Sequence, residues 1–214
     1  MMQNLFSPDS VFMRVMSRIG DLMLLNLLFL LTCIPLITVG AAVTAMYSVT
    51  FRFDTDSEAS VIRSYFRAFR ADWKQSTVIW LVVLLCGGSS CFNMLLFSRL
   101  PGIFSIASVL FALLLVLVLL TAGFVFPLLS QFDNPVMVTL KNAFALSLGF
   151  LPRAVLIAVV NLLPLIVFLA DVYVFFQTAF IWAAIFFAAA AYLNTLLLKP
   201  VLARFLEERK LDKC

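Results

Sequence analysis

The sequence contains no histidine, and only 12% of its 214 residues are charged. Histidine is the most frequent general acid or base in enzymes and a frequent metal ligand. The sequence also has no Walker glycine loop, no G-x-S-x-G or H-E-x-x-H motif and no Rossmann fingerprint. We therefore expect no enzymatic activity, no cofactor and no metal site.

Cysteines are few and do not follow a metal-binding pattern. Cys86 and Cys91 enclose four residues within apolar sequence, and no histidine accompanies them as a further ligand. Cys33 and Cys214 stand alone. We interpret all four as small apolar side chains that fill space.

Apolar residues are correspondingly abundant. Hydrophobic residues make up 64% of the chain, whereas soluble domains contain roughly 45–50%. A helix needs about 20 apolar residues to cross the roughly 30 Å hydrocarbon core of a bilayer. The sequence therefore predicts an all-α, polytopic transmembrane helical bundle that forms a single membrane domain over residues 1–214. We expect five spans, at approximately residues 21–39, 77–97, 103–129, 154–171 and 174–198.

The first apolar run is longer than one span, because it continues to residue 51. Pro35 removes a backbone donor and favours a kink or a break. After it, Gly40, Thr44 and other small residues have the spacing of closely packed membrane helices. Either one long broken helix or a hairpin of two short membrane segments fits this pattern. We favour the long broken helix.

Basic residues gather in three regions, 52–76, 130–153 and 199–214, which together hold twelve of the 15 lysines and arginines. The positive-inside bias places these regions, and thus the C-terminus, in the cytoplasm. A hairpin would add Arg14 and Arg18 to the same side, so the charge distribution favours it, but its halves of about 15 residues are short for full crossings. Since the basic residues form no single stripe, we expect the lipid bilayer as partner and no nucleic acid.

Two linkers are predicted to form amphipathic helices, at residues 57–75 and 135–148. In the first, aromatic residues recur every four positions and basic residues line the adjoining face, which is typical of a helix at the membrane interface. It is either an elbow helix that orients the first two spans, which we favour, or a docking surface for a partner. The candidate interface residues are Arg63, Phe66, Arg67, Phe69, Arg70, Trp73 and Lys74.

Polar residues within the apolar runs are the remaining candidates. Asp171 lies at a predicted turn between the last two spans, where it is a candidate cation or proton site or, as we favour, a solvated turn residue. Most spans contain one asparagine, which would hydrogen-bond between helices or line a polar path, and we favour the packing role. These asparagines are Asn26, Asn93, Asn161 and Asn194.

The segment NLLFLLTCIPLITVGAAVTAMYSVTFRF, followed by SVIRSYFRAFRADWKQSTVIWLVVLL, resembles the YesL family of bacterial integral membrane proteins. The residues that carry the likeness are Asn26, Pro35, Thr38, Gly40, Thr44, Ala45, Tyr47, Phe66, Phe69 and Gln75. The resemblance implies a compact helical protein of a bacterial plasma membrane, known mainly as a domain of unknown function, with no established catalytic residues.

Members of this family are often encoded beside carbohydrate ABC transporters. The resemblance therefore implies an accessory or regulatory role in carbohydrate uptake, and an autonomous small-molecule or sugar transporter is the alternative. The candidate packing or functional residues are Asn26, Pro35, Thr38, Gly40, Thr44 and Tyr47. Nothing in the sequence indicates a ligand or an oligomeric state.

Overall fold

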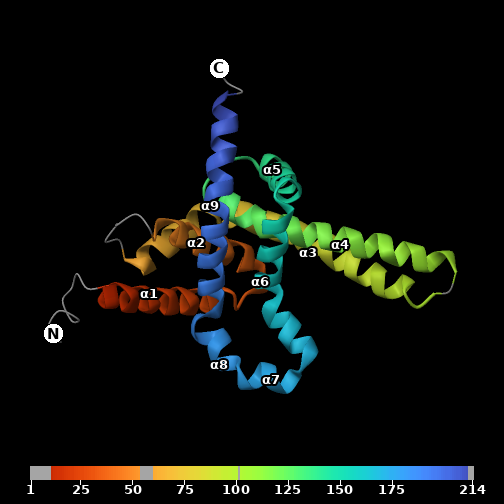
Figure 1. Ribbon diagram of the computed structural model, residues 1–214, viewed down its shortest axis with the longest axis horizontal. Coiled ribbons are helices and arrows are strands. Elements are labelled where there is room, and N and C mark those ends of the chain that lie inside the picture. The colour runs from red at the N-terminus through yellow and green to blue at the C-terminus, as the bar shows by residue number, and fades with distance from the viewer. Residues whose placement is uncertain (1–10, 54–59, 101, 212–214) are drawn as a thin grey trace.

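The computed structural model describes residues 11–53, 60–100 and 102–211, and the regular structure in these ranges is entirely helical (Figure 1). Five helices are long and apolar enough to cross a membrane. The predicted all-α class is thereby confirmed, and the number of helices that are long and apolar enough agrees with the five predicted spans.

The first apolar run forms a helical hairpin. Helix α1 (Val11–Thr32) ends before Pro35, and the short 3-10 helix η1 (Leu36–Thr38) leads into α2 (Val39–Arg52). Contacts between the start of α1 and the end of α2 show that the chain reverses there. The Arg18 guanidinium donates to the carbonyl of Phe53 and lies 5.0 Å from the centre of the Phe53 ring. The break at Pro35 is confirmed, but the favoured long broken helix is wrong (Figure 1).

The turn of this hairpin is closed by Thr38. Its hydroxyl oxygen lies 2.6 Å from the Thr32 carbonyl oxygen and 2.7 Å from the Pro35 carbonyl oxygen. The Thr32 carbonyl lies at the end of α1, where the backbone acceptors lose their helical partners, and the Pro35 carbonyl also accepts the Thr38 backbone N–H at 2.9 Å. The Thr38 side chain therefore offers a hydrogen-bond donor to the Thr32 carbonyl at the break.

Helix α3 (Val61–Phe97) runs without interruption for 37 residues. The expected division into an amphipathic helix at 57–75 and a span at 77–97 is therefore wrong, and residues 57–59 lie outside the described ranges. At about 1.5 Å per residue the helix is about 55 Å long, which exceeds the hydrocarbon core and requires tilt or protrusion. Helix α4 (Ile103–Leu129) returns beside it, with the predicted bounds.

The C-terminal part begins with α5 (Val136–Gly149) and α6 (Leu151–Ala170), close to the predicted ranges 135–148 and 154–171. The last span differs from the expected 174–198, since the apolar helical stretch starts at Ala179 and reaches Leu206. One short helix precedes this stretch, and three consecutive helical segments form it. These are α7 (Val172–Gln177), α8 (Ala179–Ile181), the π-helical turn η2 (Trp182–Phe186) and α9 (Phe187–Leu211).

Helix α2 lies at the centre of the fold. It contacts α1, α3, α4 and α9, and Figure 1 shows α6 and α9 running across the direction of α3 and α4 near it. Its small residues allow a close approach to α3, because a Cβ atom on Gly40 would lie only 2.5 Å from the Ser76 carbonyl oxygen. The Ser76 hydroxyl donates to the Thr44 hydroxyl at 3.0 Å. The predicted packing through small residues is confirmed, and its partner is α3.

Candidate functional site

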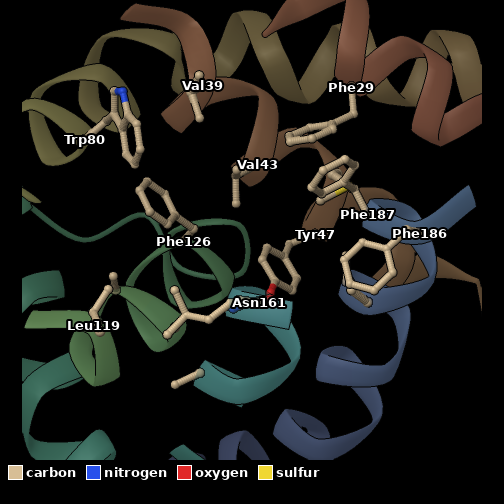
Figure 2. A pocket seen from close by; sticks show the side chains of 17 residues that line it. Phe29, Val39, Val43, Tyr47, Trp80, Leu119, Phe126, Asn161, Phe186 and Phe187 are labelled. Atoms are coloured by element: carbon tan, nitrogen blue, oxygen red, sulfur yellow. The ribbon is translucent and has the colours of Figure 1, made fainter. Parts of the chain in front are cut away.

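A cavity of about 430 Å³ lies where the helices cross. Its wall is formed by side chains from α1, α2, α3, α4, α6, η2 and α9, and most of them are apolar (Figure 2). None of the lining residues is charged. Besides Tyr47, the aromatic lining residues are Phe29, Trp80, Phe126, Phe186 and Phe187.

One part of the wall is polar. The side-chain amide of Asn194 on α9 donates to the Tyr47 hydroxyl at 3.0 Å and to the Asn161 carboxamide oxygen at 2.8 Å. Tyr47 on α2 and Asn161 on α6 line the cavity, and Figure 2 shows the Tyr47 hydroxyl directed towards Asn161. Three helices far apart in sequence thus supply one polar cluster, which we call the Tyr47 cluster: Tyr47, Asn161 and Asn194.

The Tyr47 cluster has unused hydrogen-bonding capacity. Asn194 is fully buried, and its carboxamide oxygen has no partner among the described residues. Tyr47 is 3% exposed, and its oxygen accepts the bond from Asn194, so the hydroxyl proton remains to be donated. Buried polar groups are normally paired, which makes this cluster the best candidate for ligand recognition in the described part of the chain.

Asn26 has a different role, because it holds the π-helical turn. Its amide nitrogen donates to the carbonyls of Trp182 at 3.3 Å and Ala183 at 2.6 Å, and its carboxamide oxygen accepts from the Ala188 backbone N–H at 3.1 Å. A π-helical turn changes the register of the helical hydrogen bonds. The fully buried Asn26 therefore joins α1 to the irregular start of the last span.

The other candidates from the first segment do not reach the cavity. Pro35 and Thr38 form the hairpin turn, and Gly40 and Thr44 pack against α3. Only Tyr47 lines the cavity. The sequence predicted that Asn161 and Asn194 hydrogen-bond between helices, and the structure confirms that role for the pair. The sequence gave no signal that these asparagines lie beside Tyr47. It also gave none for Trp80, whose ring lines the cavity while its indole N–H donates to the Leu36 carbonyl at 2.9 Å.

A second region of interest is the N-terminal part of α3. Among the seven candidate interface residues, Phe69 is half-buried and stacks on the buried Tyr65 with ring centres 6.3 Å apart. The other six are exposed and follow one another at helical spacing, so they share one side of the helix. We call this side the basic–aromatic face: Arg63, Phe66, Arg67, Arg70, Trp73 and Lys74.

Asp171 lies at the turn between α6 and α7, where it caps the latter helix. Its carboxylate accepts the backbone N–H groups of Tyr173 at 2.8 Å and Val174 at 3.3 Å. The side chain is exposed, and capping accounts for an acidic residue at this position. The described residues contain no group of three or more Cys, Asp or Glu side chains that could hold a metal ion.

Comparison with known proteins gives one match. The model of a family described as "Protein of unknown function, DUF624" matches residues 22–94, which cover the second half of α1, all of α2 and most of α3. No curated protein and no solved structure matches the chain. The match confirms a likeness to an uncharacterised family in the segment that carries the sequence resemblance, and the YesL name remains a prediction. Over about a third of its length, the chain is similar to DUF624, a family of unknown function.

Proposed function

We propose that this protein is an accessory or regulatory component of a membrane complex, without catalytic activity of its own, and that it binds its partner through the basic–aromatic face. The observation that carries the proposal is the exposure of four cationic and two aromatic side chains along one side of α3. Arginine and aromatic residues are enriched at protein interfaces. Charge complementarity makes an acidic surface of the partner the expected counterpart.

The basic–aromatic face is firmly connected to the protein core. Tyr65 lies next to Phe66 in the same helical turn, and its hydroxyl oxygen is 2.5 Å from that of Thr32 at the end of α1. Further along the same helix, Ser76 packs against α2. A partner bound at this face would therefore be coupled to the hairpin of α1 and α2 through one continuous helix.

We further propose that the protein belongs to a bacterial plasma membrane and has a cytoplasmic C-terminus. The positive-inside bias supports this orientation. Figure 1 supports it too, because the basic regions at the starts of α1 and α3, on α5 and at the end of α9 lie towards the left and top of the view. The turn from α3 to α4 and helix α7 lie at the right and bottom. The sequence resemblance makes a carbohydrate ABC transporter the first partner to test.

Neutralising the basic–aromatic face is expected to reduce partner binding about fourfold or more. The variant combines Arg63→Gln, Arg67→Gln, Arg70→Gln and Lys74→Gln, and each lost ion pair at an exposed site is worth roughly 0.2–1 kcal/mol. The measurement is photocrosslinking in cells from a benzophenone amino acid at position 66, followed by identification of the captured protein. The proposal is supported if the parent protein captures a transporter subunit and the neutralised variant captures less of it.

The matched control keeps the charge. Arg63→Lys, Arg67→Lys and Arg70→Lys together should retain most of the crosslinking, since ion pairing with an acidic surface persists. Crosslinks to lipid alone, in both the parent and the neutralised protein, would contradict the accessory role and favour the interfacial elbow helix.

The cavity supports a second candidate, an autonomous small-molecule transporter. It lies at the crossing of the apolar helices and has a polar cluster in its wall, as expected for a site near the middle of a membrane protein. Uptake of radiolabelled sugars and oligosaccharides by the purified protein in liposomes tests this function. Uptake that Ala158→Phe abolishes would support it, and no accumulation above protein-free liposomes would exclude it for those compounds.

A further inference from the structure

We propose that the central cavity is a binding site for an uncharged, single-chain lipid whose polar end carries a hydrogen-bond-accepting oxygen, such as a monoacylglycerol. The inference concerns the purified protein alone and does not depend on the accessory role. It rests on the composition of the cavity wall, on the Tyr47 cluster and on the exposure of the neighbouring part of α6.

The residues that line the cavity favour an uncharged ligand. Its residues include no basic or acidic side chain, so a buried phosphate, carboxylate or ammonium group would have no counter-charge there. Burying an unpaired charge is strongly unfavourable. The volume of about 430 Å³ lies in the range of small-molecule sites, about 300–1,000 Å³.

The Tyr47 cluster selects an acceptor. The Tyr47 oxygen receives the amide N–H of Asn194, and its hydroxyl proton can be donated to an oxygen in the cavity. A ligand oxygen at this place would accept the proton of a hydroxyl that is almost fully buried. Asn161 lies beside it and offers a second polar contact.

The same wall disfavours a carbohydrate. A sugar buries several hydroxyl groups, each of which needs a hydrogen-bond partner. The lining supplies Tyr47 and Asn161, while the indole N–H of Trp80 is already bonded to Leu36. Most hydroxyls of a bound sugar would remain unpaired, whereas an acyl chain matches the Phe, Leu, Val and Ala side chains of the wall.

The ligand can enter from the lipid side of α6. Asn161 is exposed, and Ala158, one turn before it, is only half-buried although both residues line the cavity. Further exposed apolar side chains follow on the same helix, including Leu165, which is 51% exposed. A lipid with its chain in the bilayer therefore has a route to the polar cluster that does not cross water.

The test uses the full chain in phosphatidylcholine nanodiscs with a monoacylglycerol that carries a photoreactive diazirine in its acyl chain. We expect saturable labelling of peptides from α2 and α6, competed by unlabelled monoacylglycerol. Tyr47→Phe should weaken the apparent affinity about three- to tenfold, and Ala158→Phe should abolish the saturable labelling by filling the cavity. Tyr173→Phe removes a hydroxyl from the exposed helix α7 and should leave labelling unchanged.

Labelling that is not saturable, or that is equal in all variants, would show annular lipid only and overturn the proposal. Competition by maltose but not by monoacylglycerol would overturn it in favour of a carbohydrate site. A symmetric size-exclusion profile of Tyr47→Phe and Ala158→Phe confirms that lost labelling does not reflect unfolding. The variant with a neutralised basic–aromatic face should label normally, so failure of the accessory role and failure of the lipid site are separate results.

Discussion

Replacing Gly40 with alanine is expected to destabilise the protein by about 3 kcal/mol. The added Cβ would lie 2.5 Å from the Ser76 carbonyl oxygen and 2.6 Å from the Trp80 Cβ. Neither atom belongs to the flexible end of a side chain, so α2 and α3 must separate, and overpacking of this kind costs roughly 1–3 kcal/mol or more. For a chain of this size the midpoint of thermal unfolding should fall by roughly 6–12 °C. Tryptophan-detected size-exclusion chromatography after heating in detergent measures the shift.

Gly88→Ala provides the matched control. Gly88 lies in the same helix α3 as Ser76, and a Cβ there would meet no atom within 4 Å. Since glycine inside a helix costs about 0.5–1 kcal/mol relative to alanine, this variant should be neutral or slightly more stable. Equal thermal stability of Gly40→Ala and Gly88→Ala would contradict the close contact of α2 with α3.

Replacing Asn26 with leucine is expected to cost about 2 kcal/mol. Leucine has a similar size but cannot bond to the Ala183 carbonyl or the Ala188 N–H, which Asn26 pairs at 2.6 and 3.1 Å. Buried groups left without a partner cost about 1–3 kcal/mol each, partly offset because the helix can relax. Size-exclusion chromatography after heating measures the loss of stability. Hydrogen exchange should also show faster exchange in η2 and the first turns of α9.

Asn93→Leu is the control for this change. The Asn93 side chain donates to the Ser89 carbonyl of its own helix at 2.8 Å, so the substitution breaks no bond between helices. We expect an effect within about 0.5 kcal/mol, as for most substitutions away from the core. A loss of stability as large as that of Asn26→Leu would contradict the claim that the bonds of Asn26 between helices cause its effect.

Helix boundaries were predictable where residues with special backbone properties mark them. Helix α4 has the predicted bounds because Pro101 and Gly102 precede it, and α5 follows Pro135 at the expected place. Pro35 likewise predicted that the first helix ends. It did not predict the direction of the chain afterwards, because the hairpin depends on contacts such as that of Arg18 with Phe53, 35 residues apart.

Helix α3 shows why a change in polarity is a poor guide to a helix end. Around residues 75–77 the sequence passes from an amphipathic to an apolar pattern, yet Gln75, Ser76 and Thr77 include no proline or glycine to interrupt the helix. The predicted amphipathic helix and the predicted second span therefore form one continuous helix. Similarly, the π-helical turn η2 carries no sequence signal of its own, because its irregular backbone is paired by the distant Asn26.

The candidate site was predictable in its parts but not as a unit. The sequence singled out Tyr47 through the family resemblance, and Asn161 and Asn194 as polar residues in apolar spans. Their meeting requires α2, α6 and α9 to converge, and Asn194 lies 147 positions after Tyr47. Contacts at this separation are set by the tertiary arrangement of the helices. For the same reason, no local sequence pattern predicts the apolar cavity beside these residues.

The most direct test of the central claim, a membrane protein whose first segment is a hairpin with basic regions in the cytoplasm, is the accessibility of single cysteines. In a variant without native cysteines, one cysteine is placed at Phe12, Ser60, Leu100, Asp133, Tyr173 or Arg204, and intact cells are treated with a membrane-impermeant maleimide. We predict labelling from outside at Leu100 and Tyr173, and labelling at the other four positions only after the membrane is permeabilised. Labelling of Phe12 from outside, with Ser60 protected, would contradict the hairpin.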